Sequence, residues 1–183
     1  MTPAPRPEHH DQRDQRDDRL SHVRADGSAH MVDVTAKPAT ARTATARGAV
    51  RTRADVIARI AEGELPKGEA LATARLAGIM GAKRTHELIP LCHPLPIGGI
   101  EVELHPAGDR VEITATVRTT GATGVEMEAL TAVTVAGLTV IDMIKAVDRA
   151  AAIVDVEVVE KAGGRSGTWR REHGTASGPG EGA

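Results

Sequence analysis

Lysine is scarce in this sequence, so the few lysines are candidates for chemistry. Five of the 23 basic residues are Lys, and the others are Arg. A buried lysine amine can lose its proton, whereas an arginine guanidinium stays charged, so a lysine can serve in proton transfer. Lys67 lies between Pro66 and Gly68 in a predicted loop between two helices, a setting where functional residues are common. Chance explains any single lysine equally well.

A second lysine, Lys145, follows Asp142 by three residues in a long apolar segment. Residues three apart share a helix face, so the two side chains can interact. An ordinary helix ion pair, worth about 0.2–0.5 kcal/mol, is one interpretation of this spacing. The other is an acid–base pair, because charges on an otherwise apolar helix are expected to be partly desolvated. Burial would favour the neutral amine and Asp142 the charged amine, so the net direction stays open.

A thiol and an imidazole stand side by side at Cys92 and His93, in the proline-rich loop 88–99. Adjacent residues rarely form a nucleophile and its base, and neither a second cysteine nor a spaced histidine completes a structural metal set. We therefore expect neither a metal site nor a thiol protease. Two interpretations of His93 remain: it contacts a substrate, or it is hydrogen-bonded to the loop backbone.

Glycine-containing segments suggest where an anion or a base could bind. The segment 121–124 precedes the long apolar helix and can present backbone N–H groups to an anion. Glu126 and Glu128 fall in the first turn of that helix, where they suit the helix dipole but would repel a phosphate. We interpret them first as helix-start residues and second as acceptors for the N–H edge of a base. The segment 161–167 has a phosphate-binding composition without the spacing of a P-loop.

The composition indicates one domain whose partner is a small molecule or another subunit. A chain of 183 residues, 40% hydrophobic, supports one domain at about 100–200 residues per domain. The net charge of −2 and the lack of Phe and Tyr disfavour nucleic acids and membrane surfaces as partners. The single cysteine has no partner for an internal disulfide, and no secretion signal pattern is present, so we expect a cytoplasmic protein.

The hydrophobic periodicity predicts an α+β fold in the central part of the chain. We expect a disordered charged tail over 1–28, a single catalytic domain over 29–167 and a flexible tail over 168–183. The domain is predicted to contain, in order, a strand ending at Val50, a helix from a capping-box-like start at Thr52 to Gly63, a helix over 69–83, a hairpin of strands 100–105 and 111–117, a helix over 125–150 and a strand over 153–159. Without the inserted helix 69–83, this is the split β-α-β order of a ferredoxin-like sandwich with an antiparallel sheet.

The helix predicted over 125–150 is apolar on nearly every side, whereas a surface helix needs one apolar stripe. We therefore expect a second subunit to cover its outer face. Glu128 and Asp142 are 14 residues apart, which is about 21 Å along a helix. If both act in catalysis, the site is expected to be shared between two subunits.

Five short segments within residues 29–168 together resemble one known family. They are Met31-Val32-Asp33-Val34, Lys83-Arg84-Thr85 with the segment 88–95, the segment 124–131, Asp142-Met143 with Lys145-Ala146-Val147, and the segment 161–167. In this order they resemble the MoaC family of molybdenum cofactor biosynthesis, the cyclic pyranopterin monophosphate synthases. The chain departs from the family pattern in its long charged amino-terminal tail and at Arg165.

The resemblance implies an assembly and a reaction. The assembly is a homohexamer, a trimer of dimers of ferredoxin-like subunits, with sites at the subunit interfaces. In the reaction, a radical SAM GTP cyclase supplies 3',8-cyclo-7,8-dihydro-GTP, which is rearranged to cyclic pyranopterin monophosphate with release of pyrophosphate. The resemblance implies Lys/Asp acid–base catalysis with no cofactor and no metal.

Site residues follow from the resemblance position by position. Asp142 and Lys145 resemble the catalytic aspartate and lysine of the family, and Lys67 resembles its second catalytic lysine. The substrate-binding positions are matched by Leu91, Cys92, His93, Met127 and Glu128, with Glu126, Lys83 and Arg42 as expected neighbours.

One alternative function belongs to a different class. A non-catalytic ferredoxin-like module that binds a nucleotide for regulation would return the cyclised substrate unchanged and release no pyrophosphate. An RNA-recognition module shares the sheet topology but needs stacking aromatic side chains, and Phe and Tyr are absent.

Overall fold

The computed structural model describes residues 22–24, 26–63, 65 and 69–172. The chain divides into one unit ending at Val32 and another beginning at Asp33. In the first unit, Val23 and Ala29 form an isolated antiparallel bridge across a turn. The carboxylate of Asp26 accepts hydrogen bonds from the backbone N–H and the hydroxyl of Ser28, at 2.9 and 2.6 Å. This turn lies within the segment for which the composition predicts a tail.

The second unit is built on one antiparallel sheet. Its strands are β1 (Thr40–Arg51), β2 (Ile97–Ala107), β3 (Arg110–Gly121), β4 (Ala152–Ala162) and β5 (Trp169–Arg170), in the order β2-β3-β1-β4-β5. The first four strands have the order of the split β-α-β sandwich, so the predicted α+β class and antiparallel sheet are confirmed. The two-residue strand β5 pairs with β4 and falls in the segment 168–183, where we expected a flexible terminus.

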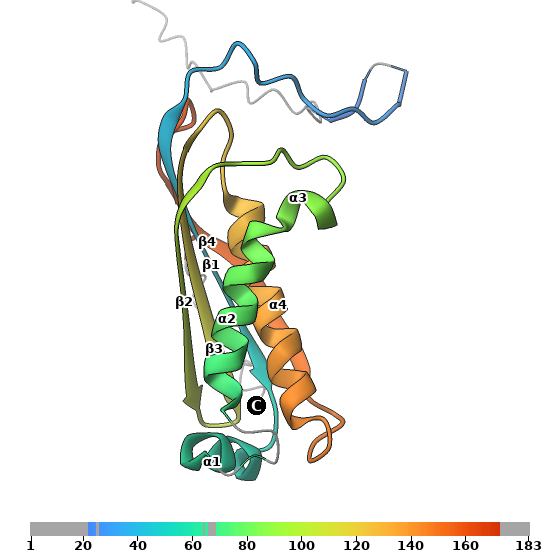
Figure 1. The fold of residues 1–183 in the computed structure, drawn as a ribbon, viewed down its shortest axis with the longest axis vertical. Helices are drawn as coiled ribbons and strands as arrows, with labels where there is room; N and C mark the ends of the chain where they lie inside the picture. Colours follow the sequence, from blue (N-terminus) through green and yellow to red (C-terminus); the bar gives the residue numbers. More distant parts are fainter. Residues whose placement is uncertain (1–21, 25, 64, 66–68, 173–183) are drawn as a thin grey trace, which may run out of the picture. The chain divides into compact units, whose positions relative to one another are not determined.

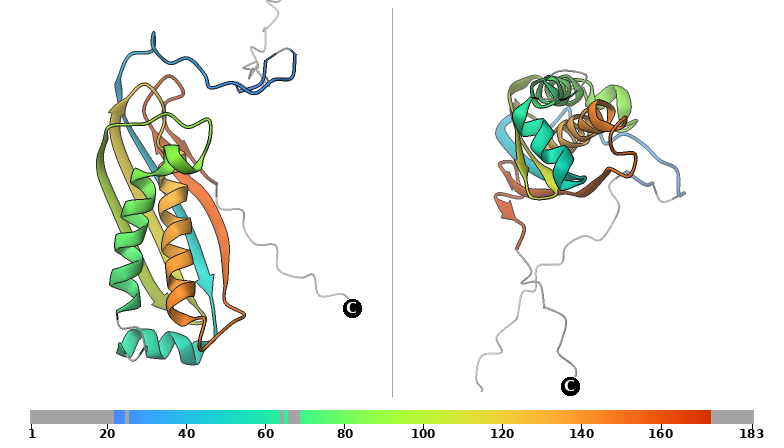
Figure 2. Two further views of the ribbon diagram at one scale, coloured as in Figure 1. Left: turned by 45° about the vertical axis from the view of Figure 1, so that its right-hand side comes forward. Right: turned by 90° about the horizontal axis from the view of Figure 1, so that it is seen from below.

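Two helices cover one face of this sheet. They are α2 (Ala70–Lys83) and α4 (Glu126–Ile144), and the shorter helices are α1 (Ala54–Glu62) and α3 (Thr85–Leu88). Figures 1 and 2 show α2 and α4 side by side on the sheet, with α3 beside the start of α4 and α1 at the opposite end. Helix α4 therefore runs from one end of the sandwich to the other, and its two ends carry different predicted site residues.

The core is aliphatic, and small residues let the two long helices approach closely. A Cβ placed on Gly78 of α2 would lie 2.9 Å from the carbonyl oxygen of Ala132 and 3.2 Å from Cβ of Ala136, both on α4. Helix α4 is long and apolar enough to cross a membrane, but it is mostly buried between α2 and the sheet. Its buried residues belong to the hydrophobic core of the domain.

Helix α2 covers much of the outer face of α4 within the chain, where we expected a second subunit (Figure 1). The apolar side chains that remain exposed here include Leu138 on α4 at 56%, and Leu76 and Met80 on α2 at 60% and 46%.

The start of α1 and the end of α4 differ from the sequence prediction. Thr52 does not cap α1: the N-cap position is Arg53, and the Thr52 hydroxyl donates to the Asp148 carboxylate at 2.7 Å. Helix α4 ends at Ile144 and not near Ala150. The Asp148 carboxylate also accepts the backbone N–H of Ala150 at 2.9 Å, which favours a turn over further helix.

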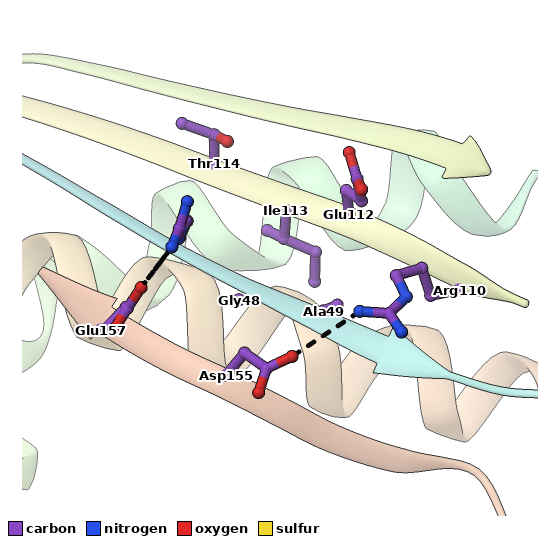
Figure 3. Close-up of a pocket in the computed structure, with 9 residues that line it drawn as sticks. Gly48, Ala49, Arg110, Glu112, Ile113, Thr114, Asp155 and Glu157 are labelled. Atoms are coloured by element: carbon purple, nitrogen blue, oxygen red, sulfur yellow. Dashed lines mark hydrogen bonds and ion pairs between the residues drawn. The ribbon is translucent and has the colours of Figure 1, made fainter. Parts of the chain in front are cut away.

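The opposite face of the sheet is polar. A hollow of about 550 Å³ lies on the side of the sheet away from α4, and Figure 3 shows the residues that line it. Two ion pairs lie in it: Nη2 of Arg47 is 2.6 Å from Oε1 of Glu157, and Nη1 of Arg110 is 3.6 Å from Oδ2 of Asp155. Because no predicted site residue within the described chain lines this hollow, its size alone does not make it the candidate active site.

Candidate active site

Glu128 is the buried carboxyl group at the first end of α4. It is 4% exposed, and its burial raises the pKa of the carboxyl above the ordinary value for glutamate. The neighbouring Glu126 raises the pKa further, whereas His86 on α3 acts in the opposite direction. Because burial disfavours the charged form, Glu128 is suited to exchange a proton or to accept hydrogen bonds from a ligand that replaces lost water.

The loop after α3 brings Cys92 close to Glu128. The Cys92 N–H donates to the carbonyl of Ile89 at 3.0 Å, which forms a turn before Pro94. Cys92 is half-buried, and its pKa is raised, first by burial and then by the charge of Glu128. A raised pKa keeps the thiol protonated, and since the thiolate is the nucleophile, this geometry disfavours a thiol-protease role.

Leu91 and His93 flank Cys92 in the same loop, and both are half-buried. His93 lies near enough to Asp33 to lower the pKa of that carboxyl, although the hydrogen bonds from Thr35 to Asp33 have the larger effect. Met127 is 38% exposed in the first turn of α4, next to Glu128. The structure thus gathers the loop residues and the start of α4 into one region.

Arg42 and Glu126 lie in an adjoining pocket, where β1, the end of β4 and the start of α4 meet. Arg42 donates from Nε to the Gly121 carbonyl at 2.9 Å and from Nη2 to the Ala122 carbonyl at 3.0 Å. Glu126 Oε1 pairs with Nζ of Lys161 at 3.0 Å. The pocket between them has a volume of about 240 Å³. Its two cations and single carboxylate suit a ligand with negative charge.

A neighbouring pocket of about 570 Å³ shares Arg42 and adds Lys37 and Arg165. The backbone is unusual here, since Gly163 and Gly164 have φ of 96° and 71°. Such glycines let the chain pass close to Arg42 without a side chain in the way.

Lys83 is exposed at the end of α2 and lines a different pocket of about 500 Å³ with Ile79, Leu95 and Ile97. It is therefore a neighbour of the proline-rich loop and does not line the two pockets that contain Arg42.

The predicted acid–amine pair lies at the other end of α4. Nζ of Lys145 is 2.6 Å from Oδ1 of Asp142, so the interaction expected from their spacing is confirmed. The side chains are 59% and 55% exposed in the single chain, so the expected partial desolvation is not seen within one copy. Lys67 lies outside the described residues. The chain therefore does not bring Asp142 and Lys145 to Glu128, since 14 residues of α4 separate Glu128 from Asp142.

Sequence reasoning did not find two contributors to these regions. Lys161 was seen as part of a glycine-rich segment, but its pairing with Glu126 joins residues far apart in the chain and leaves no local signal. His86 had no signal beyond its residue type. Among the described residues, no group of three or more His, Cys, Asp and Glu side chains could hold a metal ion.

The protein is an α+β sandwich whose core helix α4 has different groups at its two ends. The buried carboxyl group of Glu128 lies at the start of α4, near the cations Arg42 and Lys161. The ion pair of Asp142 and Lys145 lies at the other end. Such groups can bind a charged small molecule at one end and exchange protons at the other. A model described as the MoaC family matches residues 31–164, and the chain belongs to the MoaC family.

Curated relatives cover most of this chain. A protein of Corynebacterium efficiens named cyclic pyranopterin monophosphate synthase is 65% identical over 150 residues, which are 82% of this chain and 97% of the relative. A Streptomyces coelicolor protein of the same name is 61% identical over 154 residues, covering 84% and 91%. A Mycobacterium tuberculosis protein named cyclic pyranopterin monophosphate synthase 2 is 60% identical over 158 residues, covering 86% and 95%.

Proposed function

We infer that this chain is a lyase of molybdenum cofactor biosynthesis that forms cyclic pyranopterin monophosphate. The observation behind this conclusion is the identity of 60–65% with synthases of that name over nearly their whole length. It favours an enzyme over the regulatory nucleotide-binding module. The substrate we propose is 3',8-cyclo-7,8-dihydro-GTP, supplied in the cytoplasm by a radical SAM GTP cyclase, with pyrophosphate as the second product.

In the proposed chemistry, Asp142, Lys145 and Lys67 move the protons. Opening and reclosing the ring requires protons at defined atoms, and an amine paired with a carboxylate at 2.6 Å can exchange one. Lys67 supplies a second amine.

Substrate binding is proposed at the other end of α4. Glu128 accepts the N–H edge of the base, while Leu91, Cys92, His93 and Met127 hold the ring. Arg42 balances the negative charge of the phosphates, with Lys83 and Glu126 as neighbours. This assignment is supported by the half-buried loop beside Glu128 and by the cationic pockets that adjoin it.

The two groups of residues are proposed to meet between subunits. Along a straight helix, 14 residues span about 21 Å, too far for one compact site within a chain. We propose that the protein is a homohexamer, a trimer of dimers, in which the start of α4 in one copy faces the end of α4 in another. The apolar side chains of Leu76, Met80 and Leu138, exposed in the single chain, are consistent with such a contact.

Incubation with the cyclised substrate tests the reaction, with pyrophosphate and the pyranopterin both quantified. We expect the unmodified protein to form both products, and Lys145→Ala and Lys67→Ala to remain folded but inactive. The exposed neighbour Arg149 provides a matched control, since Arg149→Ala is expected to keep full turnover. Unchanged substrate with the unmodified protein would favour the regulatory module, and normal turnover in either lysine variant would contradict the assignment of roles.

Mixing two variants of lowered activity tests the shared site. Glu128→Gln and Lys145→Ala alter opposite ends of α4, so a mixed dimer contains one site with both changes and one site with neither. Random exchange of subunits between equal amounts should restore about a quarter of the sites. No recovery after verified exchange would place each site within one chain. Light scattering that shows a fully active monomer at micromolar concentration would do the same.

A further inference from the structure

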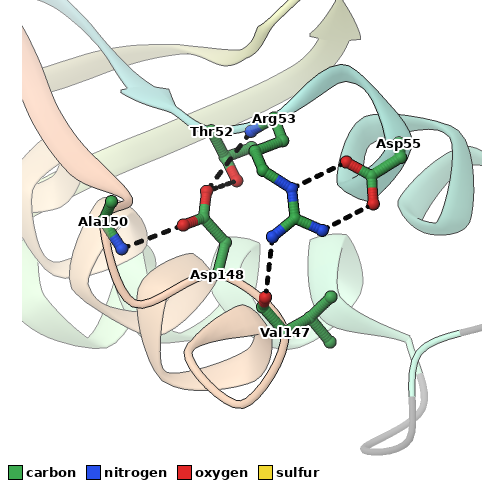
Figure 4. Close-up of polar contacts among 6 residues, drawn as sticks. All are labelled: Thr52, Arg53, Asp55, Val147, Asp148 and Ala150. Atoms are coloured by element: carbon green, nitrogen blue, oxygen red, sulfur yellow. Dashed lines mark hydrogen bonds and ion pairs between the residues drawn. The ribbon is translucent and has the colours of Figure 1, made fainter.

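A group of polar contacts joins the start of α1 to the end of α4 (Figure 4). At its centre is Asp148, which is 6% exposed. Its Oδ2 accepts hydrogen bonds from Oγ1 of Thr52 at 2.7 Å and from the backbone N–H of Arg53 at 3.3 Å. Its Oδ1 accepts the N–H of Ala150 at 2.9 Å. Asp148 therefore contacts the β1–α1 junction and the turn that leads into β4.

Arg53 adds a second link to the same turn. Its Nη1 donates to the carbonyl oxygen of Val147 at 3.1 Å. Its Nε and Nη2 donate to the two carboxylate oxygens of Asp55 at 2.9 and 2.7 Å. A guanidinium that donates to a carbonyl just past the end of a helix balances the negative end of the helix dipole. The bidentate contact with Asp55 fixes the direction of the guanidinium.

The position of Asp148 is electrostatically unfavourable without these donors. A carboxylate shortly after the end of a helix lies near the negative end of its dipole, and a buried charge is costly unless it is hydrogen-bonded. The hydrogen bond from Thr52 and the one from Ala150 lower the pKa of Asp148, so the charged form is the one these contacts hold. The donors come from the β1–α1 junction and from the turn that leads into β4, so the carboxylate of Asp148 holds these two segments together.

Lys145 lies directly in the segment that this cluster holds. Its N–H donates to the carbonyl of Ile141 at 2.8 Å, and the N–H groups of Val147 and Asp148 donate to the carbonyl of Ile144 at 2.8 and 3.0 Å. Three residues after Lys145, Asp148 is bound to Thr52. The backbone of Lys145 is thus fixed by α4 on one side and by the Asp148 cluster on the other.

We propose that Asp148, with Thr52 and Arg53, positions Lys145 for proton transfer. The proposal rests on the proposed function, since it gives Asp148 a role through Lys145 and not through contact with substrate. The cluster sets the angle of the last turn of α4, so that the amine of Lys145 remains beside the carboxylate of Asp142. The same contacts place the start of α1.

Steady-state kinetics at a temperature well below unfolding form the first test. In Asp148→Asn an amide replaces the charged acceptor, and we expect kcat to fall about 10- to 100-fold with KM changed less than about threefold, as for a catalytic group displaced by about 1 Å. Thr52→Val removes the hydroxyl donor and should also lower kcat, whereas Thr52→Ser keeps the donor and should keep kcat near that of the unmodified protein. The matched control is Asp155→Asn, an exposed aspartate on the sheet face away from α4, which should leave both constants unchanged.

The amine itself provides a readout that does not depend on turnover. With five lysines in the chain, competitive acetylation followed by peptide mass spectrometry can follow each one. We expect Asp148→Asn to change the relative reactivity of Lys145 at least about twofold, because its contact with Asp142 is altered, while Lys37 and Lys161 keep theirs. This measurement separates the two hypotheses: an inactive unmodified protein would count against the proposed function, and labelling would still test the cluster.

Each result decides the question. A lowered kcat with a changed Lys145 reactivity supports a positioning role. Normal kcat in folded Asp148→Asn, or unchanged Lys145 reactivity, overturns it and leaves the cluster a purely structural contact. If Asp148→Asn does not fold, the comparison of Thr52→Val with Thr52→Ser tests the proposal instead. The same kcat in these two variants would also overturn it.

Discussion

The packing of Gly163 against β1 gives the sharpest test of the pocket around Arg42. Gly163 follows β4 with a φ of 96°, in the left-handed region that favours glycine. A Cβ at this position would overlap the carbonyl oxygen of Ala41 and lie 3.2 Å from Cα of Arg42. Both contacts are with backbone atoms, so no side-chain rotation relieves them. Gly163→Ala must therefore move the chain apart at the pocket.

The expected loss combines two physical effects. A side chain in the left-handed region costs about 1–2 kcal/mol, and overpacking costs about 1–3 kcal/mol, so the free energy of unfolding should fall by about 2–5 kcal/mol. Gly167→Ala is the matched control, because Gly167 has a φ of 65° and no atom lies within 4 Å of its added Cβ. It should lose about 1–2 kcal/mol, from backbone strain alone.

Urea unfolding followed by circular dichroism would measure both variants, and pyrophosphate release would report on function. Because Gly163, Arg42 and Lys161 line the same pocket, Gly163→Ala should also lower turnover in the protein that remains folded, whereas Gly167→Ala should have a smaller effect. Equal losses of stability and turnover in the two variants would refute the close approach of β1 and the segment 163–167.

Three further predictions follow from burial, packing and charge. Glu128→Gln should raise the free energy of unfolding at neutral pH by about 0.5–2 kcal/mol while lowering activity. The pKa of Glu128 is raised in the folded protein, so the stability that this carboxyl contributes declines as pH rises above the ordinary glutamate range. Thermal unfolding of both proteins at pH 7 would show the difference. Gly78→Val should destabilise by at least about 2 kcal/mol, measured by urea unfolding, because its side chain would meet Ala132 and Ala136. The pKa of Asp148 is lowered in the folded protein, so its stabilising effect is present above about pH 4 and is lost as pH falls through that lowered pKa. Unfolding at a series of pH values should therefore show the stability of Asp148→Asn approaching that of the unmodified protein in acid.

Local patterns predicted the fold well where one face of an element is buried. The alternation of Val111, Ile113, Ala115 and Val117 with polar residues predicted β3, because the sheet has one covered and one polar face. The central strand β1 had a weaker pattern. Its inward side chains Ala44 and Ala46 are small, so their alternation with Thr and Arg has little contrast in hydrophobicity.

The parts that could not be predicted depend on contacts between distant residues. Thr52 resembled a helix cap because the capping pattern is local, but its hydroxyl donates to Asp148, 96 residues away. Asp148 lies just past the end of α4 at Ile144, where its charge opposes the helix dipole, but the sequence prediction of a helix over 125–150 placed it inside the helix and hid this signal. The pairing of Glu126 with Lys161 requires the end of β4 to lie beside the start of α4, which no periodicity reports.

The exposure of Asp142 and Lys145 links the candidate chemistry to assembly. An ion pair that is more than half exposed is screened by water and stabilises little, whereas proton transfer benefits from surroundings that exclude water. Leu138 precedes Asp142 by four residues, so the exposed apolar side chain and the acid share one face of α4. A contact that covers Leu138 would therefore also withdraw water from Asp142. The face of α4 that carries Leu138 and Asp142 would then hold two copies together and exclude water from the amine of Lys145. Assembly of the subunits would thereby complete the environment that proton transfer requires.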